Sequence, residues 1–224
     1  MDAAFSHIDT WIFDLDLTLY PPEANIMAQV RDRIALFVQD YFKVDSEAAH
    51  GIRYNYWQKY GTTLGGLMAE HDVEPDAYLD FVHDVDMSLL TPDAALRALI
   101  QALPGRKMIF TNADAPYAHR VLAARGLADI FEDIFDIHRM EHVPKPSPAS
   151  YAALCAQLDI TPESALFVED SAQNLVPAKA LGMRTIWVKH AGEADSSGHE
   201  EHIDHQIADV SKWLSSIHCL ESAI

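Results

Sequence analysis

Two acidic residues separated by a single position follow a short apolar run near the start of the chain. Asp14 and Asp16 come directly after Trp11-Ile12-Phe13, which is typical of the end of a buried strand. Such a pair can point both carboxylates into the crevice where open α/β sheets bind ligands. Their mutual repulsion is relieved by a bound cation or by protonation of one acid. This segment therefore predicts a chemical site.

Polar residues also follow two later apolar runs. Thr111 and Asn112 come after Met108-Ile109-Phe110, and Glu169 and Asp170 come after Leu166-Phe167-Val168. Lys145 lies between these two segments and is flanked by prolines. Each piece alone is typical of a helix cap or an exposed loop. Their order, with each group at a strand end, predicts one site at one edge of a sheet.

The expected site contains the oxygen ligands that Mg²⁺ prefers. We expect the metal to be held by Asp14, by Asp16 through its backbone carbonyl and by Asp170, with Glu169 close by. Asp14 can attack phosphorus to form an aspartyl-phosphate. Asp16 can protonate the leaving oxygen and later deprotonate water. The chemistry predicted is phosphate transfer from a small metabolite.

A phosphate dianion needs local positive charge in this chain, because 16 basic and 34 acidic residues give a net charge of −18. The field of such a chain repels phosphorylated ligands at long range. We expect Leu15, Thr111, Asn112 and Lys145 to contact the phosphate, with backbone N–H groups among the donors. The lysine and the metal would form the positive island that the reaction requires.

The composition also excludes several classes of partner. A strongly acidic chain repels nucleic acid and anionic membranes, and no apolar stretch is long enough to span a bilayer. Cys155 and Cys219 are too few for a disulfide framework. We therefore expect a cytoplasmic protein that is a monomer or homodimer and acts on a small phosphorylated metabolite.

The hydrophobic pattern predicts an α/β protein with a helical insertion. Strands are expected at 8–16, 107–110, 134–137, 165–168 and 185–188, and helices at 92–102, 115–125, 148–158, 171–181 and 206–217. Their alternation indicates a Rossmann-like, doubly wound parallel sheet. Helices expected at 24–42, 46–60, 63–72 and 75–84 interrupt this pattern after the first strand. We therefore expect a core of residues 1–20 and 91–224, a helical cap of residues 21–90, and a solvated loop at 190–205.

The ordered set of motifs resembles the haloacid dehalogenase superfamily of phosphohydrolases. Asp14-x-Asp16-x-Thr18 resembles its first motif, Thr111 its second, Lys145 its third and Glu169-Asp170 its fourth. The resemblance implies that Asp14 is the nucleophile, that Asp16 is the acid/base, that Mg²⁺ is required, and that the helical insertion is a type-1 cap.

Further segments resemble the pyrimidine 5′-nucleotidase branch, which removes phosphate from UMP, CMP or dTMP-like nucleotides. These segments include Tyr60-Gly61-Thr62-Thr63-Leu64 and Val82-His83-Asp84-Val85-Asp86. Leu17 departs from the Gly or Asn usual in the first motif; a left-handed backbone there would cost about 1–2 kcal/mol. The residues expected to select the substrate are Tyr20, Tyr60, Thr62, Thr63, His83 and Asp84.

The sequence is also compatible with other functions. The substrate could be another small metabolite, such as phosphoglycolate or a sugar phosphate. A 2-haloacid dehalogenase would lack the acid at Asp16, and a sugar phosphomutase would transfer phosphate without releasing it. A catalytically silent phosphate-binding module of the same fold would be expected to lose an acid or the lysine, and all are present.

Overall fold

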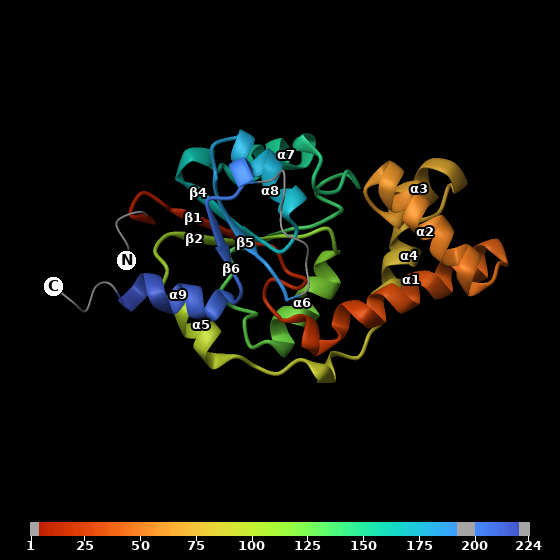
Figure 1. Cartoon of the computed structure of the whole chain (residues 1–224), viewed down its shortest axis with the longest axis horizontal. Coiled ribbons are helices and arrows are strands. Elements are labelled where there is room, and N and C mark those ends of the chain that lie inside the picture. The colour runs from red at the N-terminus through yellow and green to blue at the C-terminus, as the bar shows by residue number, and fades with distance from the viewer. Residues whose placement is uncertain (1–4, 192–199, 220–224) are drawn as a thin grey trace.

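A parallel β-sheet forms the centre of the protein (Figure 1). The computed structural model describes residues 5–191 and 200–219. Within these residues the sheet has six strands in the order β3-β2-β1-β4-β5-β6. The strands are β1 (Thr10–Phe13), β2 (Arg106–Phe110), β3 (Asp133–Phe135), β4 (Ala165–Glu169), β5 (Arg184–Val188) and β6 (His205–Ile207). The observed α/β class and doubly wound topology confirm the predicted fold class.

The central strands are buried because helices cover both faces of the sheet (Figure 1). The helices of this part are α5 (Ala94–Gln101), α6 (Ala115–Ala124), α7 (Pro148–Leu158), α8 (Ala172–Ala180) and α9 (Val210–Cys219). Helices α7 and α8 pack on one face, and α5, α6 and α9 lie on the other. In register, Phe13 of β1 pairs with Ile109 of β2 and with Val168 of β4. The carboxyl ends of these three strands therefore meet at one edge.

Four helices follow β1 and lie beside that edge, at the right of Figure 1. They are α1 (Ile26–Phe42), α2 (Ser46–Tyr60), α3 (Thr63–His71) and α4 (Pro75–Val82). Asp45 caps α2 by accepting a hydrogen bond from the Ala48 N–H at 2.9 Å. Thr62 caps α3 in the same way, accepting from the Gly65 N–H at 2.9 Å. These caps fix the start of the two helices that form much of the pocket described below.

Helices α2 and α3 approach each other closely at Gly66. A Cβ atom at this position would lie 2.2 Å from Cγ of Tyr56, which real side chains do not tolerate. The absence of a side chain at Gly66 therefore allows the Tyr56 side chain of α2 to pack closely against α3.

The C-terminal part of the sheet differs from the sequence prediction. Residues 190–205 were expected to form a solvated loop, but Glu200–His202 form a short 3-10 helix and His205–Ile207 form the edge strand β6. Residues 192–199 of that predicted loop lie outside the described residues. Within the part of the chain that the structure describes, strand β6 pairs with β5 alone. Two of its three side chains are exposed, so its sequence lacks a buried strand pattern.

The remaining elements are short. They are the 3-10 helices η2 (Pro22–Ala24), η3 (Met87–Leu89) and η4 (Pro162–Ser164), besides η5 (Glu200–His202). Across the described residues, no helix combines the length and the apolar character that a membrane crossing requires.

Candidate active site

The predicted catalytic residues converge at the carboxyl ends of β1, β2 and β4, around a buried lysine. The Lys145 ammonium lies 2.7 Å from Asp14 Oδ1 and 2.7 Å from Glu169 Oε2. It also donates to the Phe110 carbonyl at 2.8 Å. All three ammonium protons thus have acceptors. Burial alone would lower the pKa of Lys145, but the charges of Asp14 and Glu169 outweigh it and raise that pKa.

Asn112 holds the loop that carries this lysine. Its side-chain oxygen accepts from the Lys145 N–H at 2.8 Å, and its side-chain nitrogen donates to the Lys145 carbonyl at 3.1 Å. The amide was expected to bind phosphate, and the structure shows it positioning Lys145. Neighbouring Thr111 is buried, and its hydroxyl oxygen accepts from the Ala113 N–H at 3.0 Å. The turn after β2 is therefore stabilised by a hydrogen bond between its own residues.

Three acids form a cluster with the chemistry of a divalent metal site. One oxygen from each of Asp14, Glu169 and Asp170 lies within 4.8 Å of the others. Burial, then repulsion from Glu169, raises the pKa of Asp14 to about 7, and the same two causes raise the pKa of Asp170. Such a group of buried oxygen donors fits Mg²⁺, which would relieve the repulsion. Glu169 contacts Lys145 and the Ser171 N–H, and Asp14 contacts Lys145 and the Thr18 hydroxyl, so these two acids each accept one hydrogen bond per oxygen and keep lone pairs for a metal.

Asp16 lies outside this cluster and is held by two tyrosines. Its Oδ1 accepts a hydrogen bond from the Tyr117 hydroxyl at 2.7 Å and another from the Tyr20 hydroxyl. Burial raises the pKa of Asp16, and the two tyrosine hydrogen bonds oppose that rise. The carboxylate therefore has a fixed orientation beside Asp14, as an acid/base group needs. A metal contact from residue 16 would come from its backbone carbonyl.

Leu17, which stands where the first motif usually has Gly or Asn, lies in the turn after β1. This residue has φ 61°, in the left-handed region that costs a side chain like leucine about 1–2 kcal/mol. Its side chain packs against the hydrophobic core, and its carbonyl lies 2.7 Å from His190 Nε2. One residue further, the Thr18 hydroxyl donates to Asp14 Oδ2 at 3.1 Å. With Lys145 on Oδ1 and Thr18 on Oδ2, each oxygen of the Asp14 carboxylate accepts one hydrogen bond.

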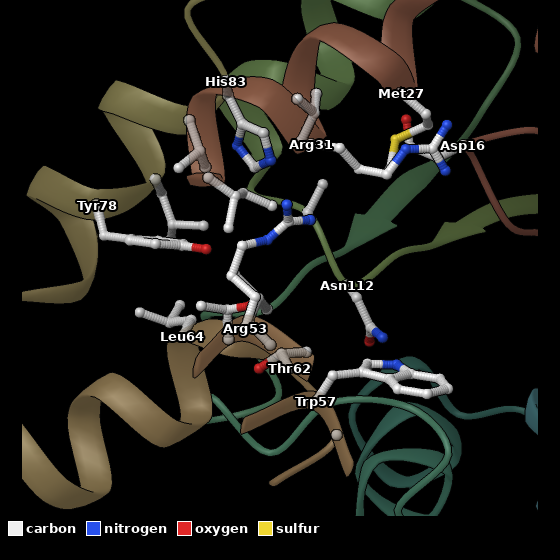
Figure 2. Close-up of a pocket in the computed structure, with 18 of the residues that line it drawn as sticks. Asp16, Met27, Arg31, Arg53, Trp57, Thr62, Leu64, Tyr78, His83 and Asn112 are labelled. Carbon is white, nitrogen blue, oxygen red and sulfur yellow. The ribbon is translucent and has the colours of Figure 1, made fainter. Parts of the chain in front are cut away.

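A pocket of about 580 Å³ opens from Asp16 into the four-helix segment (Figure 2). Its lining includes Asn112 from the β2 turn and Thr62, Thr63 and His83 from the helices. His83 is buried and stacks on Tyr117, with the ring centroids 4.3 Å apart. Its Nδ1 lies 2.6 Å from Asp114 Oδ1. Thr62, Thr63 and His83, which were expected to select the substrate, therefore do line a pocket.

The other three residues expected to select the substrate lie elsewhere. The Tyr20 hydroxyl donates to Asp16, so Tyr20 orients the expected acid/base residue. The Tyr60 hydroxyl donates to Glu70 at 2.6 Å, and Asp84 is exposed and pairs with Arg33 at 3.1 Å. Neither Tyr60 nor Asp84 lines the pocket of Figure 2. Both residues lie at or just after the end of a helix, where the sequence does not predict the direction of the side chain.

Several pocket residues were missed by sequence reasoning. Trp57 was not among the residues expected to select the substrate, but it is 49% exposed and lines the pocket. Arg31, Arg53 and Tyr78 also line it, and none was singled out. Each occupies an ordinary helical position, so only the packing of helices α1, α2 and α4 against one another brings them together. A positive charge recurring on neighbouring helices of an acidic chain was the one available signal.

The amino-acid sequence is similar to those of known hydrolases over most of its length. A family model described as a haloacid dehalogenase-like hydrolase matches residues 8–182. Phosphate metabolism protein 8 of Saccharomyces cerevisiae is 27% identical over 191 residues, covering 77% of this chain and 59% of that protein. Sesquiterpene phosphatase astK of Aspergillus oryzae is 31% identical over 97 residues, covering 42% of this chain and 49% of that protein. The chain thus matches less than two thirds of the length of these relatives.

Solved structures share the fold at low identity. The HAD-hydrolase YfnB from Bacillus subtilis, bound to magnesium, has a TM-score of 0.63 at 16% identity over 94% of this chain and 99% of that one. A HAD phosphatase from Thermococcus onnurineus has a TM-score of 0.59 at 18% identity over 96% and 98%. An L-2-haloacid dehalogenase from Xanthobacter autotrophicus has a TM-score of 0.57 at 18% identity over 94% and 98%. At such identities the likeness shows the fold alone.

Proposed function

This chain belongs to the haloacid dehalogenase-like hydrolases, and from that premise we propose that it is a Mg²⁺-dependent phosphatase of small phosphate monoesters. The observation that carries the proposal is the buried Lys145 between Asp14 and Glu169, with Asp16 and an open pocket beside it. The phosphatase names of the relatives point the same way.

The reaction would proceed in two steps on this chain's own residues. A carboxylate oxygen of Asp14 attacks phosphorus, the ester P–O bond breaks, and Asp16 gives its proton to the leaving oxygen. Asp16 then takes a proton from water, whose oxygen attacks the phosphoryl group and restores Asp14. Lys145 lowers the charge repulsion throughout. A divalent cation bound by the acid cluster supplies further charge neutralisation for the phosphate dianion.

We propose a pyrimidine nucleoside 5′-monophosphate as the substrate. The pocket volume of about 580 Å³ is in the range of small-molecule sites. The Trp57 indole at its margin offers a surface on which a base can stack (Figure 2). The motifs Tyr60-Gly61-Thr62-Thr63-Leu64 and Val82-His83-Asp84 support the same substrate by resemblance.

A phosphate-release assay tests this function. UMP, CMP, dTMP, phosphoglycolate and hexose phosphates are compared with Mg²⁺ and after chelation by EDTA, with a 2-haloacid as the control for dehalogenation. We expect release from the pyrimidine nucleotides, loss with EDTA and recovery with Mg²⁺. Halide release without phosphate release would contradict the proposal, and turnover unaffected by EDTA would remove the metal from it.

A further inference from the structure

Two arginines in the pocket lack the partners that the other arginines have. Among residues 5–191 and 200–219, Arg31 and Arg53 make neither an ion pair nor a hydrogen bond. The six arginines that pair with a carboxylate are Arg33, Arg97, Arg106, Arg125, Arg139 and Arg184. Arg120 donates to the His83 carbonyl. In a chain with a net charge of −18, two unpaired arginines on one pocket are unexpected.

Arg53 is the more enclosed of the two. Its guanidinium points into the middle of the pocket (Figure 2), and its Nε is buried without a hydrogen-bond partner. A buried donor left unsatisfied is costly unless a ligand supplies an acceptor. Burial lowers the pKa of Arg53, as does the nearby charge of Arg31, whereas Tyr78 opposes this. An arginine remains protonated through such a shift, so both groups stay cationic donors.

The other polar groups at this end of the pocket already have partners. The Asn112 amide is bonded through both its atoms to the Lys145 backbone. The Thr62 hydroxyl accepts from the Gly65 N–H, and the Asp16 Oδ1 accepts from two tyrosines. Asp16 Oδ2 is left for the proton transfer of the proposed reaction. The other charged groups, Arg31 and Arg53, are both donors, and a complementary ligand presents oxygen acceptors to them.

We propose that Arg53, assisted by Arg31, binds oxygen acceptors on the leaving group of the substrate, so that the preferred phosphate esters carry a carbonyl or carboxylate there. This inference rests on the proposed phosphatase function, because it assigns the part of the substrate that leaves. The carbonyl oxygens of a pyrimidine base and the carboxylate of a phosphorylated hydroxy acid share this chemistry. A bare sugar phosphate lacks it, since its hydroxyl groups are weaker, uncharged partners.

Binding to the full chain tests the subsite without requiring turnover. The Asp14→Asn background keeps the ligands intact, and calorimetry with Mg²⁺ present compares UMP, 2-phosphoglycolate and ribose 5-phosphate. Ribose 5-phosphate is UMP without its base, so the difference between the two isolates the base contact. We expect Arg53→Met to weaken UMP binding at least about tenfold and to change ribose 5-phosphate binding less than about twofold.

Two further variants serve as controls. Lys59→Met removes a positive charge from the same helix, but Lys59 is exposed, pairs with Glu70 and does not line the pocket, so binding should not change. Arg31→Met changes an exposed side chain that should not be needed for folding, and it should weaken UMP binding in the same direction by a smaller factor. Circular dichroism checks that each variant is folded.

The outcomes separate the subsite from the proposed function. If Arg53→Met weakens the binding of 2-phosphoglycolate and leaves that of UMP unchanged, the subsite is supported and its ligand is a carboxylate. Equal losses for all three ligands, no loss for any, or no binding by any would overturn it. Phosphate release by the wild-type chain is measured separately, so failed catalysis is distinguishable from a failed subsite.

Discussion

The proposed catalytic centre and the pocket beside it differ in whether their charged side chains have partners within the protein. In the centre, Lys145 is 2% exposed, and its ammonium has three acceptors within 2.8 Å. In the pocket, Trp57 is 49% exposed, and Arg31 and Arg53 have no partner among the described residues. The groups that would perform the chemistry are thus held in place before a substrate arrives.

This difference has a physical reason. A buried lysine between carboxylates is stable only with nearly ideal geometry, so the centre tolerates little variation. Water can satisfy the exposed Arg31 in the absence of a ligand. The buried Nε of Arg53 has no partner until a ligand supplies an acceptor. We therefore expect changes in the centre to affect every substrate and changes in the pocket to affect some substrates only.

The largest expected effect comes from Asp14→Asn. The amide keeps the size of the side chain but cannot act as the nucleophile, so kcat should fall at least about a thousandfold on every ester. Phosphate release measures the rate, and urea unfolding confirms the fold. Asp40→Asn changes an exposed acid of α1 and should leave the rate unaltered. Retention of near wild-type turnover by Asp14→Asn would remove Asp14 from the reaction.

Lys145→Met should cause the largest loss of stability. It leaves Asp14 and Glu169 buried without their cation, and removing one member of a buried ion pair costs about 3–5 kcal/mol. The free energy of unfolding in urea measures this loss. Adding Glu169→Gln should recover part of it, because one buried charge is removed. A loss below about 1 kcal/mol would show that the centre is not held as tightly as described.

Removal of the metal should have a pH-dependent effect on stability. Burial and Glu169 raise the pKa of Asp14 from 3.8 to about 7 in the folded state, so the folded state binds more protons than the unfolded one between these values. The stability contributed by this group therefore falls as pH rises from about 4 to about 7. Mg²⁺ binds the ionised acids, so it should raise Tm more at about pH 8 than at about pH 5.

Thermal unfolding in Mg²⁺ and in EDTA at both pH values measures this difference. Asp170→Asn, which removes one predicted ligand, should reduce the Mg²⁺ effect. An equal rise in Tm at both pH values would indicate that the cation binds elsewhere.

Tyr117→Phe should slow the reaction by about tenfold, because one charged hydrogen bond to Asp16 is lost. Since this bond favours the ionised carboxylate, its loss should raise the pKa of Asp16 and shift the corresponding limb of the pH–rate profile to higher pH. KM should change little. Tyr60→Phe is the matched control, because the Tyr60 hydroxyl contacts Glu70 away from the site. An unshifted profile would show that Tyr117 only fills space.

The smallest effect is expected from Trp57→Ala. Because the indole is half-exposed, stability should change by less than about 1 kcal/mol. Loss of base stacking should raise KM for UMP about fivefold and leave ribose 5-phosphate unaffected. Kinetics with both substrates measures the two effects separately, and a large loss of stability would indicate that Trp57 is a packing residue.

The sequence predicts the centre better than the pocket because strand ends are local features. Apolar runs such as Leu166-Phe167-Val168 locate buried strands, and parallel pairing then brings Asp14 and Asp170 to one edge. Strand β6 escaped prediction because His205 and Gln206 are exposed at the edge of the sheet. Its pairing with β5 depends on tertiary context.

The residues of the candidate site and pocket that the sequence did not predict lie on helices. Tyr117 occupies a position in α6 typical of a core residue, and it reaches Asp16 across 101 positions of sequence. Arg53 lies on α2, where a charged side chain ordinarily indicates a solvated face. Helical periodicity shows which residues share a face, but the partner of that face comes from helix packing, which no local pattern encodes.

The stereochemical course at phosphorus tests the central claim most directly. A phosphate ester made chiral with oxygen isotopes is hydrolysed by the wild-type protein with Mg²⁺, and the configuration of the released phosphate is determined. Attack by Asp14 followed by attack of water gives two inversions, so net retention is expected. Net inversion would mean that water attacks the ester directly, and Asp14 would not be the nucleophile.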